Sequence, residues 1–178
     1  MSPHGGLLEG KRILVTGVLT DASLAFGVAR LAQAEGAEIV LSGAGRGLSL
    51  TRRTARKLET QVDVIEIDVT EPEHLRAAAD DLGARWGRLD GILHAIGFAP
   101  QECLGGDILR ADWSQVAVAL EVSAYSLKAL VGSMRPLLSA AGRSSVVALD
   151  FDARVAWPAY DWMGVAKAAL ESLSLIHI

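Results

Sequence analysis

The alternation of short apolar runs with longer stretches of helical spacing constrains the fold of this chain more than any other feature. Runs such as residues 12–16 (RILVT) have the β-branched bias that is typical of buried strands. Strands that alternate with helices predict βαβ units and a parallel sheet covered on both faces. We therefore predict an α/β fold with a Rossmann-type, doubly wound parallel sheet. Its five expected strands are residues 12–16, 38–43, 62–69, 90–97 and 144–150.

Helices are expected between these strands, at residues 23–37, 49–60, 71–87 and 111–138. A last helix is expected after Pro158, because proline is tolerated in the first turn of a helix. In the first helix Gly36 suits a C-cap. The same helix carries apolar residues that fall on one side at helical spacing, namely Leu24, Val28, Leu31 and Ala32.

Composition excludes several classes of protein. The chain has 178 residues, of which 51% are hydrophobic and 21% charged, and this balance predicts a soluble globular domain. The net charge is −4 without a basic stripe, so a nucleic-acid partner is not expected. No signal peptide and no uninterrupted apolar stretch of about 18 residues is recognised, so we expect no membrane segment. The single Cys103 fits a reducing compartment, and we expect a cytoplasmic protein. We assign no metal ligand.

In doubly wound folds ligands bind at the carboxyl ends of the strands. The loop after the first expected strand reads TGVLTDASLAFG, with Gly17 directly after the strand and Ser23 as a candidate N-cap. A turn of small residues that leads into a helix N-terminus can bind an anion such as a dinucleotide pyrophosphate. The alternative is a tight turn that only packs the helix on the sheet.

The later loops carry weaker signals. The loop after residues 38–43 contains Arg46 and no acid, which leaves NADP binding open beside a merely solvated arginine. Asp68 could meet an adenine amino group or serve as a turn residue. Gly97 would allow a close approach of the backbone to a ligand, and His94 is expected to be a packed histidine.

Tyr160 and Lys167 form the strongest candidate pair. A spacing of seven residues would place both side chains on one face of a helix, two turns apart. A lysine cation near a phenol favours the phenolate and makes the hydroxyl a better acid or oxyanion donor. The alternative is an ordinary amphipathic helix with a surface lysine. Phe151, nine positions before Tyr160, would line a pocket or fill the core.

Together these motifs resemble the short-chain dehydrogenase/reductase superfamily, and more narrowly its NADH-dependent enoyl-[acyl-carrier-protein] reductases. The Gly-x5-Ser-x-Ala turn, the stretch HAIGF and the Tyr-x6-Lys spacing are similar to that branch. The stretches SAYSLKAL and DFDARVAWPAYDWMGVAKAALES look most like the mycobacterial and actinobacterial proteins, the type that isoniazid targets. The resemblance runs from about Leu7 to Ser172.

The resemblance implies reduction of the trans-2 double bond of enoyl thioesters with NADH in fatty-acid synthesis, including synthesis of the mycolic-acid type. Tyr160 would hydrogen-bond the thioester carbonyl oxygen, Lys167 would hold the nicotinamide ribose, and Phe151 would flank nicotinamide and substrate. Acyl carrier protein is the implied partner, and full-length relatives are expected to be homotetramers. The implied cofactor contacts are Gly17, Val18, Ser23 and Leu24 at the pyrophosphate, Asp68 and Val69 at adenine, and Ile96 and Gly97 at the ribose.

Three places depart from the family pattern. Ala44 and Gly45 stand where close relatives have an aromatic residue and an acid, although NADH remains favoured over NADPH. Ala95 stands where close relatives often have serine. The chain also ends early, with five of the seven strands of the family. We therefore expect an incomplete reductase domain at residues 1–172 and a non-native tail at 173–178, whose LSLIHI resembles a translated sequencing adapter.

The truncation would leave the fifth strand as a bare sheet edge and expose apolar surface, so we expect poor solubility and little turnover. Two alternative functions stay open. One is another short-chain reductase such as a 3-oxoacyl reductase, against which the Tyr-x6-Lys spacing speaks. The other is a non-catalytic nucleotide-binding remnant.

Overall fold

The computed structural model describes residues 6–152 and 154–175, and these residues divide between two compact units. The first unit consists of Met1–Ala95 with Gly132–Val147, and the second of Ile96–Val131 with Ala148–Ile178. Of the expected tail 173–178, residues 176–178 lie outside the described residues. Each unit is described separately below.

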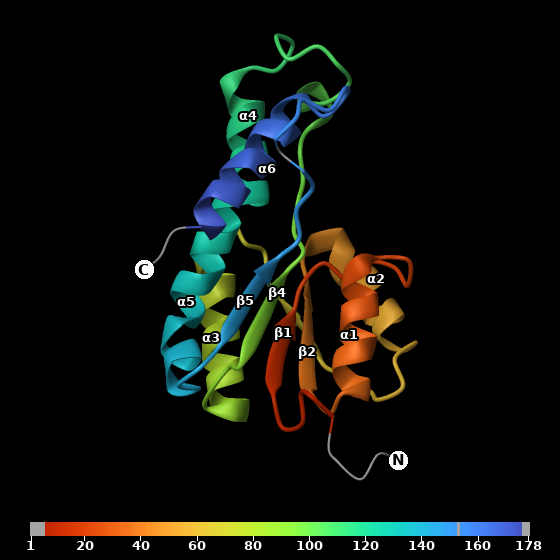
Figure 1. The fold of residues 1–178 in the computed structure, drawn as a ribbon, viewed down its shortest axis with the longest axis vertical. Coiled ribbons are helices and arrows are strands. Elements are labelled where there is room, and N and C mark those ends of the chain that lie inside the picture. The colour runs from red at the N-terminus through yellow and green to blue at the C-terminus, as the bar shows by residue number, and fades with distance from the viewer. Residues whose placement is uncertain (1–5, 153, 176–178) are drawn as a thin grey trace. The chain divides into compact units, whose positions relative to one another are not determined.

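The first unit is built on a five-stranded sheet with the order β3-β2-β1-β4-β5. Strand β1 pairs in parallel with β2 on one side and with β4 on the other, and β2 pairs in parallel with β3. Helices α1 and α2 cover one face of the sheet, and α3 and the end of α5 cover the other (Figure 1). The predicted Rossmann-type, doubly wound sheet is therefore confirmed. The strands are Arg12–Val15, Glu38–Gly43, Val64–Glu66, Gly91–His94 and Ser145–Ala148.

Helix α1 (Leu24–Ala34) turns a different face toward the sheet than its leucine pattern suggests. Leu24 is 76% exposed and Leu31 is 62% exposed, whereas Ala25, Ala29 and Ala32 are buried together with Phe26. One residue rotates a helix by about 100°, so the alanine row lies beside the leucine row. The small side chains allow the helix backbone to approach the sheet closely. The C-cap is Glu35, and Gly36, predicted as the C-cap, follows it one position later with a φ of +89°.

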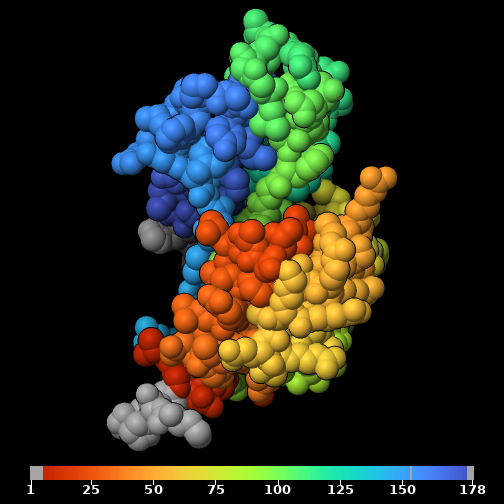
Figure 2. All heavy atoms as spheres, turned by 90° about the vertical axis from the view of Figure 1, so that its right-hand side faces the viewer, coloured from red at the N-terminus to blue at the C-terminus, as the bar shows by residue number. Residues whose placement is uncertain are grey.

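The remaining helices of the first unit are α2 (Gly45–Ala55) and α3 (Pro72–Trp86). Helix α2 begins and ends several residues earlier than predicted. Helix α3 matches its prediction, because Pro72 occupies the first turn and Gly87 ends the helix in the left-handed conformation, with φ of +65°. Figure 2 faces the side of this unit that α1 and α2 cover.

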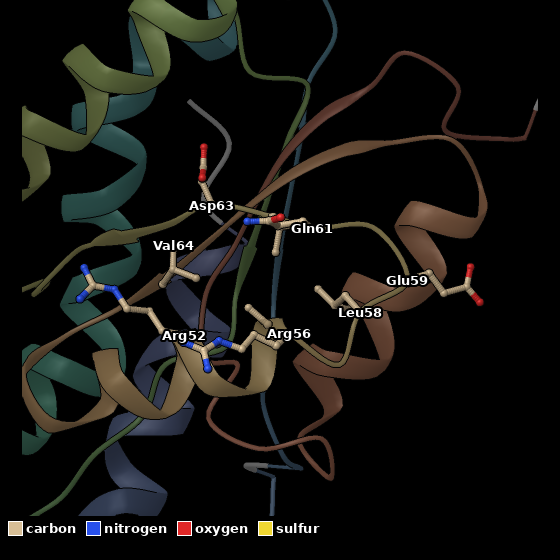
Figure 3. A pocket seen from close by; sticks show the side chains of 9 residues that line it. Arg52, Arg56, Leu58, Glu59, Gln61, Asp63 and Val64 are labelled. Carbon is tan, nitrogen blue, oxygen red and sulfur yellow. The ribbon is translucent and has the colours of Figure 1, made fainter.

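A surface hollow of the first unit lies between α2 and the segment that leads into β3 (Figure 3). Arg52 and Arg56 project from α2, and Gln61 and Asp63 come from the segment. Asp63 stands at the beginning of β3, which is the amino-terminal end of a strand. Ligands of doubly wound sheets bind at the opposite, carboxyl ends, so we do not assign a cofactor to this hollow.

The second unit is mainly helical. It contains η1 (Gln101–Cys103), α4 (Trp113–Leu120), the π-helical segment η2 (Glu121–Tyr125), the start of α5 (Ser126–Ala140) and α6 (Asp161–Ser174). Asp112 caps α4 in a reciprocal capping box with Gln115. One small core gathers around the free, buried Cys103 with Val116 and Ala119, and another joins Ala124, Leu127 and Leu170.

The helical run Trp113–Ala140 is long and apolar enough to span a membrane by length and composition alone. Side chains along it, including Val116, Leu130 and Met134, are buried within the protein. Glu121 also interrupts its apolar sequence. Other side chains of the run, including Trp113, Val118 and Tyr125, are exposed, so the run is partly buried.

Strand β5 is an edge strand, as expected, and its Val146 and Val147 are 37% and 51% exposed. Exposed apolar edges pair readily with other chains. We therefore predict that the 178-residue polypeptide is poorly soluble and that Val147→Lys increases the fraction remaining in the supernatant after centrifugation. Val155→Lys is the matched control, since Val155 is equally exposed, at 53%, but lies outside the sheet. A soluble wild-type monomer with ordinary turnover would contradict the prediction.

Candidate functional site

The turn after β1 depends on Gly17. Its φ is +77°, which L-residues with a side chain rarely adopt, and a Cβ atom at this position would collide with the carbonyl oxygen of Ala95. The turn therefore lies directly against the end of β4. This close packing agrees with the second alternative considered for the turn, a tight turn with a packing role. It does not test binding of an anion, so the anion site stays a prediction.

Thr16 joins the carboxyl ends of the two central strands of the first unit. Its buried hydroxyl donates to the carbonyl oxygen of Leu93 at 2.9 Å and accepts from the backbone N–H of Ala95 at 2.9 Å. Sequence reasoning missed this residue. The available signal was a hydroxyl residue at the end of an apolar strand and directly before the glycine turn.

The other residues of this turn differ in their hydrogen bonds and in the exposure of their side chains. Ser23 occupies the N-cap of α1, but its hydroxyl donates to the carbonyl oxygen of Thr20 at 2.5 Å and makes no side-chain cap. The side chain of Val18 is fully buried, so only its backbone could meet a ligand, whereas Leu24 is exposed. An ion pair between Lys57 and Asp21, at 2.6 Å, ties the turn to the end of α2. This pairing lowers the pKa of Asp21.

Asp68 acts as a turn residue in the first unit. One carboxylate oxygen accepts from the backbone N–H of Thr70 at 3.0 Å and from its hydroxyl at 2.7 Å. These bonds support the local interpretation of Asp68 and do not test an adenine contact. Val69 is buried, and Arg46 is exposed in the first turn of α2.

In the second unit Lys167 is almost fully buried, with 7% of its surface exposed. Its Nζ donates to the carbonyl oxygen of Leu149 at 3.1 Å and lies 3.5 Å from that of Ile96. Burial lowers the pKa of Lys167, and the charge of Asp150 opposes that shift. A Cβ atom at Gly97 would lie 3.5 Å from Nζ, so Gly97 leaves the amine reachable from that side.

Ser123 fixes the loop that contains Gly97. Its buried hydroxyl donates to the carbonyl oxygen of Phe98 at 2.8 Å and accepts from the N–H of Phe98 at 2.9 Å. Ser123 lies in η2, and π-helical turns occur frequently at functional sites. Sequence periodicity predicted one regular helix here and could not reveal the π-turn.

Tyr160 stands at the N-cap of α6 and not within the helix. The prediction that both residues share one helix face is therefore corrected, because Ala159 has a positive φ of +69° and the helix begins only at Asp161. The Tyr160 side chain is 45% exposed, and its ring centroid lies 4.7 Å from that of Phe151. Among the described residues, Lys167 bonds to backbone carbonyls and not to the Tyr160 hydroxyl.

His94 is the last residue of β4 in the first unit. His94 has no exposed surface, as expected for a packed histidine. Within residues 6–152 and 154–175, no group of three or more His, Cys, Asp or Glu side chains could hold a metal ion.

We predict that Gly17→Ala destabilises the first unit, because it forces an unfavourable φ and a backbone collision. The expected loss is about 2 kcal/mol or more in the free energy of unfolding. Gly27→Ala is the matched control, since Gly27 lies within α1 with nothing within 4 Å of an added Cβ, and alanine favours helix by about 1 kcal/mol. Urea unfolding of both variants measures the difference. If Gly17→Ala has the same free energy of unfolding as Gly27→Ala, the turn can relax around a side chain and the prediction is wrong.

Comparison with known proteins adds independent evidence. A family described as Enoyl-(Acyl carrier protein) reductase matches residues 17–175. The protein named enoyl-[acyl-carrier-protein] reductase [NADH] of Mycolicibacterium smegmatis is 44% identical over 173 residues, covering 95% of this chain and 63% of the relative. Proteins of the same type from Mycobacterium avium and Neisseria meningitidis serogroup B are both 40% identical, covering 95% and 94% of this chain and 63% and 64% of their own lengths. The chain thus spans less than two thirds of these relatives.

Proposed function

Because this chain belongs to the enoyl-(acyl carrier protein) reductase family, we propose that it carries the cofactor-binding and catalytic residues of a reductase acting on enoyl thioesters with NADH. The substrate would be a trans-2-enoyl group on acyl carrier protein, in fatty-acid or mycolic-acid type synthesis. The observation that supports this most is the burial of Lys167. Its amine lies against backbone carbonyl oxygens and next to a glycine, which is a place where ribose hydroxyls could replace or join those oxygens.

The residues of the second unit fit this chemistry. Bound nicotinamide would supply hydride to C3 of the thioester. As negative charge develops on the carbonyl oxygen, the exposed Tyr160 hydroxyl would donate a hydrogen bond to it and stabilise the enolate. Lys167 would hold the ribose hydroxyls with charge-assisted hydrogen bonds. Phe151 would limit the movement of the phenol ring and flank the reacting groups. Ile96 and Gly97 would contact the ribose through their backbone.

The first unit would take the adenosine and pyrophosphate part of NADH. Gly17, Val18, Ser23 and Leu24 would offer backbone groups at the N-terminus of α1, where the helix dipole favours phosphate. Asp68 and Val69 would meet adenine. The relatives whose names specify NADH support this cofactor over NADPH, although Arg46 stands exposed near the end of β2.

Two alternatives remain for the function. One is a non-catalytic nucleotide-binding remnant. The other is a 3-oxoacyl reductase, which would use the same fold.

We further propose a cytoplasmic protein, with homotetramers formed by full-length relatives. We also propose that residues 173–178 are a non-native tail to a domain of residues 1–172. An in-frame continuation past Ser172 at the native locus supports the tail proposal, and a verified stop codon after Ile178 contradicts it.

We predict that Lys167→Met raises the dissociation constant for NADH about tenfold or more, since charge-assisted hydrogen bonds contribute roughly 1.5–3 kcal/mol each. NADH fluorescence measures the binding. The matched control is Lys128→Met, which removes an exposed lysine of α5 that contacts Tyr125. An unchanged affinity of Lys167→Met for NADH would contradict the proposed role of Lys167 in binding the cofactor.

The same preparations separate the candidate functions. Oxidation of NADH with a crotonyl thioester, but not with a 3-oxoacyl thioester, supports the enoyl reductase. The reverse preference supports the 3-oxoacyl reductase. Binding of NADH without turnover of either substrate supports the nucleotide-binding remnant.

A further inference from the structure

The backbone around Tyr160 adopts an unusual conformation. Ala159 and Asp161 have φ angles of +69° and +37°, and Tyr160 between them has φ of −93°. Within the described residues, these two are the non-glycine residues with positive φ. Side chains disfavour this region, so such a conformation persists only where surrounding contacts maintain it.

The contacts come from a loop of two glycines, Gly105 and Gly106, whose φ angles are +110° and +95°. The N–H of Gly105 donates to the carbonyl oxygen of Ala159 at 3.1 Å. The N–H of Gly106 donates to Oδ2 of Asp161 at 2.7 Å, the short distance of a charge-assisted hydrogen bond. The loop therefore binds the residue before Tyr160 and the residue after it.

A third contact secures the same loop to the start of α6. The indole N–H of Trp162 donates to the carbonyl oxygen of Ile108 at 3.0 Å. Its side chain also packs against the core around Cys103 and Val116. These bonds hold the backbone on both sides of Tyr160 and leave the phenol half-exposed against Phe151.

We propose that Asp161 is the positioning residue for Tyr160. Its carboxylate fastens the two-glycine loop to the start of α6 and so maintains the backbone turn that directs the phenol toward Phe151. The proposal rests on the proposed function in one respect, namely that Tyr160 is the oxyanion donor. Asp161 itself acts through the backbone and not on the substrate. The carboxylate is the part of this arrangement that a single substitution can remove without changing the glycines.

Substitutions of Asp161 separate the carboxylate from the backbone conformation. Asp161→Gly removes the acceptor and relieves the positive φ, whereas Asp161→Asn keeps an accepting oxygen and tolerates positive φ. Asp161→Glu keeps the charge but displaces the acceptor, and it serves as a second test if the glycine variant does not fold. Asp107→Ala is the matched control in the same loop, because the Asp107 carboxylate accepts only from Leu109 N–H, at 3.3 Å, among the described residues.

The first measurement is hydrogen exchange of the Gly106 amide without ligand. The wild type and every variant are compared in the 178-residue chain that also carries Val147→Lys, because that substitution is expected to increase solubility. We expect exchange to accelerate about tenfold or more in Asp161→Gly and Asp161→Glu, because the amide loses its charged acceptor. Exchange in Asp161→Asn and Asp107→Ala should stay near the wild-type rate. A wild-type Gly106 amide as fast as an unprotected one would overturn the proposal.

The second measurement reports on Tyr160 itself, through the nuclear Overhauser effect between the Phe151 and Tyr160 rings. We expect this contact in the wild type, Asp161→Asn and Asp107→Ala, and its loss in Asp161→Gly and Asp161→Glu. Release of Gly106 with an unchanged ring contact would mean that Asp161 stabilises the loop without positioning Tyr160, and would overturn the proposal. So would loss of the contact in Asp161→Asn. Neither measurement needs NADH or substrate, so a failure of the proposed reductase function is distinguishable from a failure here.

Discussion

Parallel pairing on both sides of β1 is the constraint on which the first unit depends. Because β1 pairs with β2 and with β4, three carboxyl strand ends come to the same edge of the sheet. The Thr16 hydroxyl then bonds to the backbone on both sides of His94, so the spacing of the two central ends is set by a side chain as well as by the ladder. Gly17 can enter its turn only because nothing projects from its Cα toward β4.

The second unit depends on a buried cation. An ammonium group removed from water is costly unless hydrogen-bond acceptors surround it, and here backbone carbonyl oxygens fulfil that need. Those oxygens belong to Leu149 and Ile96, in segments far apart in the sequence. Ser123 fixes the Phe98 backbone next to one of these segments. Lys167 is therefore both a structural link within its unit and a group suited to polar ligands.

Much of the fold could be predicted because its signals are local. The strand positions and the α3 boundaries with Pro72 and Gly87 follow from patterns within a few residues. The burial of α1 could not be predicted in the same way, since leucine spacing marks an apolar stripe but close packing on a sheet favours the adjacent alanines. Candidate site residues were predicted by motif, whereas Thr16, Ser123 and Asp161 bond to backbone partners that are distant in sequence.

The π-helical segment η2 has a consequence for the long helix that contains it. A π-turn accommodates one residue more than an α-helical turn, so residues after Tyr125 are rotated by about 100° relative to a regular helix of the same length. The face on which Val116 and Ala119 lie is thus continued, beyond η2, by residues one position later in the sequence than in a regular helix. Deleting one residue from the segment Glu121–Tyr125 would restore regular geometry and leave Leu130 in its buried position, whereas a regular α-helix through all of these residues would rotate Leu130 out of it. The π-turn therefore absorbs one residue and keeps Leu130 on the buried face of its unit.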